Sequence, residues 1–165
     1  MQIETYIRRK GANIELTRDS RASTEDGGEG MQIRLSFLWI FAILNYLYAD
    51  VMSTMDASVL RSLLSGEVGG IQITPGFLLG AAVLMETAIL MVPVSRFAPW
   101  RTNRLLNIVV GTIHTLAVSA SMFVDGPPDA YYILFGTVEI STTIAIVVMA
   151  ARWSGALHAR AVQPG

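Results

Sequence analysis

Four long stretches of the sequence contain no Lys or Arg and at most one acidic residue each. They cover residues 35–55, 76–95, 105–124 and 130–151, which are 21, 20, 20 and 22 residues long. A helix needs about 20 mostly apolar residues to cross the hydrocarbon core of a bilayer. The sequence therefore predicts an all-α protein, a four-helix transmembrane bundle. The partner expected from this alone is the surrounding lipid bilayer.

The charged residues are too few and too unevenly placed for a soluble or disordered chain. Only 15% of the 165 residues are charged and the mean hydropathy is +0.48; residues 1–34 hold 12 of the 25 charged side chains. The net charge of −1 provides no basic field for nucleic acid, so no nucleic-acid partner is expected. The absence of cysteine excludes disulfide scaffolds and thiol chemistry.

Basic residues predict the orientation of the bundle, because they favour the cytoplasmic side. Eleven of the twelve lie in the N-terminal segment, between spans two and three, or after span four, whereas only Arg61 lies on the other side. We therefore expect a multi-pass protein of the inner (plasma) membrane, with both termini in the cytoplasm.

The chain divides into a membrane domain, residues 31–155, and two tails. Residues 1–30 are predicted to be a flexible tail, in which residues 3–16 could pair as a hairpin. Met31-Gln32-Ile33 repeats the opening tripeptide, and a chain that began at Met31 would keep every span, so residues 1–30 are also open to interpretation as a start-site extension. Residues 156–165 form a short C-terminal tail.

The first outer loop is predicted to contain a short interfacial helix. Asp56 suits the N-cap of a helix over residues 57–65, and Gly66 suits its C′ position. Leucine and valine side chains form an apolar stripe along this helix, which predicts a position in the membrane interface. Beyond it, a pair of glycines precedes Pro75, where the second span is expected to begin.

Polar residues within the predicted spans are the candidate ligand- or proton-binding residues, because a charged group in the bilayer centre costs roughly 2.5–3.5 kcal/mol. They are Asn45, Asp50, Glu86, Asn107, His114 and Glu139. Glu86 and His114 lie near the middle of their spans, and Asp50 and Glu139 lie toward the outer side. We expect the four ionisable side chains to face the interior of the bundle.

Polar and small residues also recur at helical spacing, which predicts inward faces on the spans. Asn107, Gly111 and His114 follow this spacing in the third span, and the fourth span repeats it around Glu139. In the second span, glycines at positions 76 and 80 form a G-x-x-x-G motif, which is typical of close helix packing.

Two functions of different class fit these residues. The first is a small transporter, with proton coupling as one option, that binds a small polar or cationic ligand at the buried acids. The second is a non-catalytic module whose polar groups fix helix packing or contact a partner membrane protein. A homodimer is a further expectation, because four spans form a narrow pathway. No catalytic motif is present, so an enzyme is disfavoured, and neither a metal nor a cofactor is expected.

The first span, Leu38–Val51, resembles a family of small uncharacterised bacterial four-helix membrane proteins. Its Leu-Asn-Tyr-Leu-Tyr-Ala-Asp motif, the Gly69–Thr74 segment, Met85-Glu86 and the segment from Tyr131 to Glu139 carry the likeness. The resemblance covers roughly residues 33–153 and implies a four-helix integral membrane protein. It implies no activity.

Overall fold

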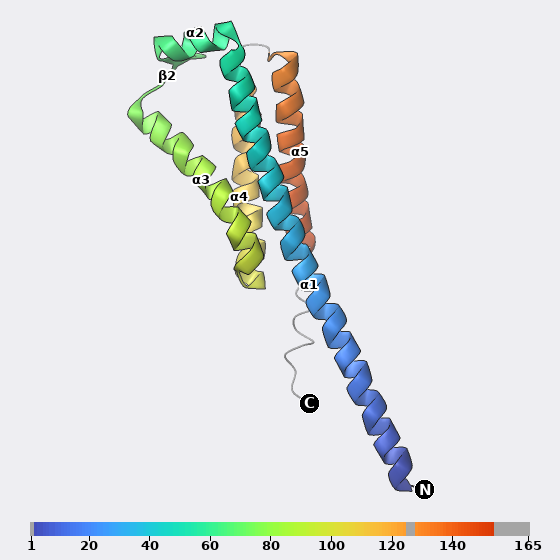
Figure 1. Ribbon diagram of the computed structural model, residues 1–165. Coiled ribbons are helices and arrows are strands. Elements are labelled where there is room, and N and C mark those ends of the chain that lie inside the picture. Colours follow the sequence, from blue (N-terminus) through green and yellow to red (C-terminus); the bar gives the residue numbers. More distant parts are fainter. Residues whose placement is uncertain (1, 125–127, 154–165) are drawn as a thin grey trace.

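The computed structural model describes residues 2–124 and 128–153, with side chains from residue 28 onward. Five helices and two short strands follow one another in the order α1, α2, β1, β2, α3, α4 and α5 (Figure 1). Their bounds are Gln2–Met55 (α1), Ala57–Ser65 (α2), Glu67–Val68 (β1), Ile71–Gln72 (β2), Pro75–Phe97 (α3), Trp100–Ser121 (α4) and Ala130–Arg152 (α5).

The predicted all-α bundle with four apolar helices is confirmed. Four helical segments are long and apolar enough to cross a membrane: Gly28–Met55 of α1 and the whole of α3, α4 and α5. The third of these begins at Trp100, earlier than the expected residue 105, and ends at Ser121 rather than 124. Charge counting placed that boundary after Arg104, but an arginine does not interrupt helical hydrogen bonding, whereas Pro99 at the N-cap does.

The N-terminal segment differs from the expected hairpin. Helix α1 is continuous from Gln2 and enters the membrane segment without a break. An isolated hairpin is marginal in water, whereas a helix that is already nucleated gains one hydrogen bond for each residue added. The expectation of a hairpin is therefore wrong. The interpretation of residues 1–30 as a flexible tail, and its alternative as a start-site extension, stay predictions, and the C-terminal tail, 156–165, lies outside the described residues.

Helix α2 forms where its caps predict it. The Asp56 side chain accepts a hydrogen bond from the Ser58 N–H, and Gly66 ends the helix in the left-handed conformation with φ of 77°. The strands β1 and β2, which were not predicted, follow as an antiparallel hairpin. Its two-residue turn consists of Gly69 and Gly70, with φ of 55° and 80°; a turn with positive φ at both central positions matches the twist of the strands.

The hairpin lies against the loop that follows α4. A Cβ atom added at Gly69 would collide with the carbonyl oxygen of Val124. The close approach requires glycine and joins the first outer loop to the second.

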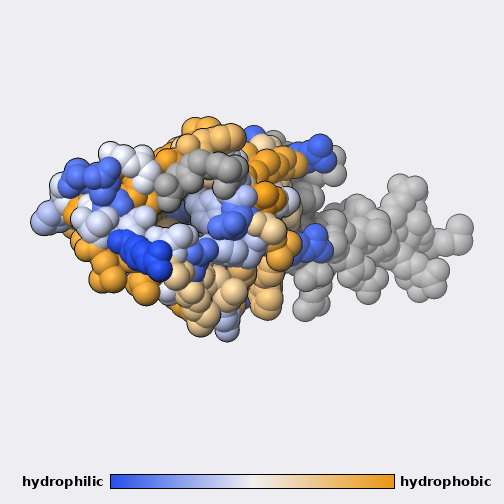
Figure 2. All heavy atoms as spheres, turned by 90° about the horizontal axis from the view of Figure 1, so that it is seen from above, coloured by the Kyte–Doolittle hydropathy of each residue, from blue (hydrophilic) through white to orange (hydrophobic). Residues whose placement is uncertain are grey.

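The four long helices are arranged so that α1 packs on α3 and α5, and α4 packs extensively on α5 and less on α3. We call the end that carries α2 and β1–β2 the hairpin end. The opposite end, where Arg34, Arg96, Arg101, Arg104 and Arg152 lie, is the basic end. Seen from the hairpin end, hydrophilic residues occupy much of the top and hydrophobic residues form its sides (Figure 2), as expected for helices that face lipid.

Helix α3 converges on the bundle only toward the basic end and diverges from α1 toward the hairpin end (Figure 1). Its buried residues, Ala88, Met91 and Ser95, all lie in its second half. By contrast, residues 75–83 are all exposed. The hydrophobic core is therefore concentrated toward the basic end, where Leu35, Trp39, Ile146 and Trp153 are buried.

Candidate functional site

The polar residues singled out in the spans do not form one cluster. Asn107, His114 and Glu139 are buried, and Asn45 is half-buried. Asp50 and Glu86 are exposed. The buried residues fall into two groups at different depths, one with complete hydrogen bonding and one without.

The first group, toward the basic end, is a hydrogen-bonded polar lock formed by Trp39, Ser95, Asn103 and Asn107. The indole Nε1 of Trp39 on α1 donates to Asn107 Oδ1 at 2.8 Å, and the Ser95 hydroxyl on α3 donates to the same oxygen at 3.2 Å. The Asn107 amide donates to Asn103 Oδ1 at 2.7 Å and to the Asn103 carbonyl at 2.9 Å. One amide therefore ties three helices together.

Asn103 closes the lock by donating from Nδ2 to the Ser95 carbonyl at 2.7 Å. All four residues of the lock are completely buried. Of these, only Asn107 was singled out from the sequence. Asn103 lies four residues before Asn107 and so shares its helix face, and this spacing could have identified Asn103 from the sequence. Trp39 lies on another helix, so no spacing within one span could have connected it to the two asparagines.

His114 lies one step further toward the hairpin end, between α1 and α3. Its imidazole stacks on the Tyr46 ring with centroids 5.7 Å apart and meets the Trp39 ring edge-on at 5.6 Å. Its Nε2 lies 3.1 Å from the Thr87 hydroxyl, which itself donates to the Leu84 carbonyl. His114 is thus held by aromatic packing on one side and a polar contact on the other.

The second group, next to His114, pairs Glu139 of α5 with Tyr46 of α1. Glu139 is 6% exposed and Tyr46 is 5% exposed. The Glu139 Oε1 and the Tyr46 hydroxyl are both buried without a hydrogen-bond partner. Glu139 lies close enough to Tyr46 for a charge on its carboxyl to act on the phenol, and Asp50, one helical turn from Tyr46, lies close enough for its charge to act on Glu139.

These unmet hydrogen bonds are unusual, because buried polar groups are nearly always paired. Elsewhere among the described residues, Trp100 Nε1 at the basic end is the other buried side-chain atom without a partner. The Glu139–Tyr46 pair differs from Trp100 because it offers an acceptor and a donor together. We refer to Tyr46, Glu139 and Asp50 as the carboxyl–phenol site.

Glu86 does not belong to this site, and the expectation that it faces the interior is wrong. At about 100° per residue, Glu86 lies about 140–200° around α3 from Ala88, Met91 and Ser95, the residues that α3 buries. Its side chain therefore leaves the helix on the face opposite the bundle. An acid near the middle of a span can face inward or toward a partner, and the sequence alone does not distinguish these cases.

Small residues position α4 and α5 around the site. A Cβ atom at Gly111 would lie 2.8 Å from the Val147 side chain, and one at Gly136 would lie 3.1 Å from the Met122 sulfur. The inward faces predicted around Asn107 and Glu139 are thus confirmed. The predicted role of the second-span glycines is not, because a Cβ atom at Gly80 would meet no atom within 4 Å.

The chemistry available at the carboxyl–phenol site is hydrogen bonding and charge compensation. A carboxylate accepts hydrogen bonds, and a phenol both donates and accepts them. Within the described part of the chain, no three His, Asp or Glu side chains come together as metal ligands. The groove between α4 and α5, about 140 Å³ and lined by Thr112, Thr115, Leu116, Ile144 and Val147, contains none of the ionisable residues.

The chain was compared with known protein families, curated proteins and solved structures. Residues 26–159 match a family described as "Family of unknown function (DUF6326)". Neither a curated protein nor a solved structure matches the chain.

Proposed function

Because the chain belongs to DUF6326, a family of unknown function, we propose its function from the site: it binds a small polar or cationic solute at the carboxyl–phenol site and carries it across the membrane. The observation that carries this proposal is the pair of unmet hydrogen bonds at Glu139 Oε1 and the Tyr46 hydroxyl. A buried polar atom without a partner costs about 1–3 kcal/mol. A solute that satisfies both atoms recovers this free energy.

The charges around the site favour a solute with hydrogen-bond donors. Two carboxyl groups lie there, those of Glu139 and Asp50, and they are close enough for the charge of one to act on the other. The basic residue nearest to Asp50 in sequence is Arg61, in the outer loop. The one nearest to Glu139 is Arg152, at the basic end of α5. Ammonium and guanidinium groups supply only donors and a positive charge, which complements both carboxyls.

The difference in exposure between the two acids suggests a route. Asp50 is exposed and lies toward the hairpin end, whereas Glu139 is buried. A cation would meet Asp50 first and then Glu139, and a proton on Glu139 would replace the cation's charge after release. This exchange would couple transport to a proton gradient.

The proposal is tested with purified protein in lipid vesicles and three labelled probes: guanidinium, methylammonium and urea. We expect uptake of at least one cationic probe by the wild type, dependent on an imposed pH difference. Glu139→Gln keeps the shape of the side chain but removes its charge, so this uptake should be lost. Glu67→Gln, at an exposed carboxylate of β1, is the matched control and should transport normally.

Two results would contradict the proposal: no protein-dependent uptake of any probe, or equal uptake by the wild type and Glu139→Gln. Circular dichroism of each variant checks that the helices are retained. If either contradicting uptake result is obtained, the second function, a structural or interaction module, is favoured. The complete hydrogen bonding of the polar lock around Asn107 supports it.

The basic residues support an orientation in which the basic end faces the cytoplasm of a bacterium, with both termini inside. Reporter fusions after residue 100 should read as cytoplasmic, and fusions after residue 66 should read as external. The opposite pattern at either position would contradict this topology.

A further inference from the structure

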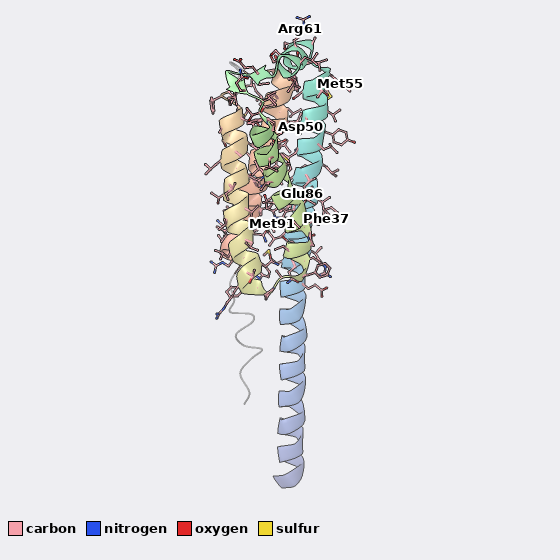
Figure 3. All side chains as sticks on the ribbon, turned by 90° about the vertical axis from the view of Figure 1, so that its left-hand side faces the viewer. Phe37, Asp50, Met55, Arg61, Glu86 and Met91 are labelled. Atoms are coloured by element: carbon pink, nitrogen blue, oxygen red, sulfur yellow. The ribbon has the colours of Figure 1, made fainter. Side chains whose placement is uncertain are left out.

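Glu86 lies at the midpoint of α3, eleven residues from Pro75 and eleven from Phe97. In Figure 3 it lies at a level between Asp50 and Met91, and it belongs to the apolar span Pro75–Phe97. Its side chain is exposed and leaves the helix opposite the face that packs on the bundle. In a bilayer this position faces hydrocarbon, where an unpaired carboxyl group is expensive.

The residues beside Glu86 form a regular seam along the same face of α3. Leu79, Ala82, Glu86 and Ile89 are separated by three, four and three residues, the spacing of the contact positions in parallel paired helices. All four are exposed. We refer to these four residues as the α3 seam.

We propose that the α3 seam binds the α3 seam of a second copy of this chain, so that Glu86 meets Glu86 of the partner subunit in the middle of the membrane. The pair takes up one proton from water, and the protonated carboxyl group of one subunit then donates a hydrogen bond to the carboxylate of the other. Each copy supplies the polar partner that the other lacks.

Several features favour a copy over a different protein. All copies insert with the same orientation, so a two-fold axis along the membrane normal brings identical residues to the same depth. Glu86 therefore meets a polar group at its own level without any further matching. A single polar residue within an apolar seam is typical of pairings with fixed register, and the small side chain of Ala82 lets the two helices approach closely.

The first half of α3 is free to make this contact. Residues 75–83 are exposed on every side, and the α3 residues that pack on the bundle lie beyond them. The proposal is independent of the carboxyl–phenol site, which α3 does not contribute to.

Cysteine cross-linking tests the seam, because the chain contains no cysteine of its own. Ala82→Cys and Ile89→Cys are introduced singly on the seam. Leu116→Cys is the control, at an exposed position on α4. Like Ala82 on α3, Leu116 lies between the middle of its helix and the hairpin end. The purified variants are reconstituted in lipid vesicles and oxidised over a range of lipid-to-protein ratios.

We expect Ala82→Cys and Ile89→Cys to form disulfide-linked dimers whose yield changes little on dilution in lipid. Leu116→Cys should give only a yield that falls with dilution. Adding Glu86→Leu to Ala82→Cys should weaken dimerisation about tenfold, while Glu86→Gln, which retains hydrogen bonding, should preserve most of it.

Three results would overturn the proposal. They are an absence of cross-linking at both seam positions, equal cross-linking at Leu116→Cys, or no effect of Glu86→Leu on the dimer. Glu86 is exposed and lies away from the bundle core, so circular dichroism should be unchanged in all these variants, and a loss of cross-linking then reports on association.

Discussion

Replacing Asn107 with Leu should destabilise the bundle more than any exposed substitution in the spans. Leucine has the same number of side-chain heavy atoms and the same branch point as asparagine, so the change removes hydrogen bonds without leaving a large cavity. Asn107 links α4 to Trp39 on α1 and to Ser95 on α3. Trp39 and Ser95 are both fully buried. Among the described contacts, the Trp39 Nε1 and the Ser95 hydroxyl have no hydrogen-bond partner other than Asn107.

The magnitude follows from two interhelical contacts. Leaving a buried donor unmatched costs about 1–3 kcal/mol in soluble proteins. Measured couplings between membrane helices are smaller, about 0.6 kcal/mol on average and about 1.7 at most, because the separated helices also find partners. At about 1 kcal/mol for each contact, Asn107→Leu should lower the free energy of unfolding by about 2 kcal/mol.

The assay is unfolding in mixed micelles with increasing SDS, followed by far-ultraviolet circular dichroism. Thr112→Ala is the control, since its hydroxyl is exposed and bonds only within α4; its effect should stay within about 0.5 kcal/mol. In a double-mutant cycle, Trp39→Phe removes the donor, and the coupling with Asn107→Leu should be about 1 kcal/mol. A coupling of zero, or Asn107→Leu as stable as Thr112→Ala, would refute the reasoning.

Three further predictions concern the end of α5, the β1–β2 turn and the start of α2. Arg104→Ala removes two hydrogen bonds to the last carbonyls of α5; amide exchange there should accelerate and stability should fall by about 1 kcal/mol, and unchanged exchange would count against this contact. Gly69→Ala should destabilise the protein more than Gly70→Ala in the same SDS assay, because both need positive φ but only Gly69 lies against the loop after α4; equal losses would exclude that close contact. Hydrogen bonds from the hydroxyl and then the backbone N–H of Ser58 lower the pKa of Asp56, so its capping contribution is complete above the ordinary value of 3.8 and disappears as the pH falls through the lower folded value. Exchange in α2 should therefore rise in acid for the wild type but not for Asp56→Asn, and identical profiles would argue against the cap.

The helices were largely predictable because each depends on local sequence. Apolar length predicted the spans, and Asp56 and Gly66 predicted both ends of α2. The β1–β2 hairpin was missed although its signal is local: two glycines between β-branched residues, Val68 and Ile71, are typical of a two-residue turn.

The candidate site was less predictable because it depends on the rotation and tilt of each helix. Spacing correctly placed Asn107, His114 and Glu139 on inward faces. Spacing could not place Glu86, because it is a single acid in an otherwise apolar helix. No second polar residue at helical spacing shows whether its face points into the bundle or toward a partner. The unmet hydrogen bonds of Tyr46 and Glu139 arise between helices far apart in sequence, so no local pattern contains them.

The one-sided attachment of α3 has a mechanical consequence. The helix is held near Ser95 by the polar lock and has no buried residue in its first half, so a tilt about its basic end would disturb few buried contacts. Twenty residues separate Ser95 from Pro75, a span of about 30 Å. A tilt of about 10° at the basic end would therefore move the far end by about 5 Å, while the residues of the lock move by less than a bond length.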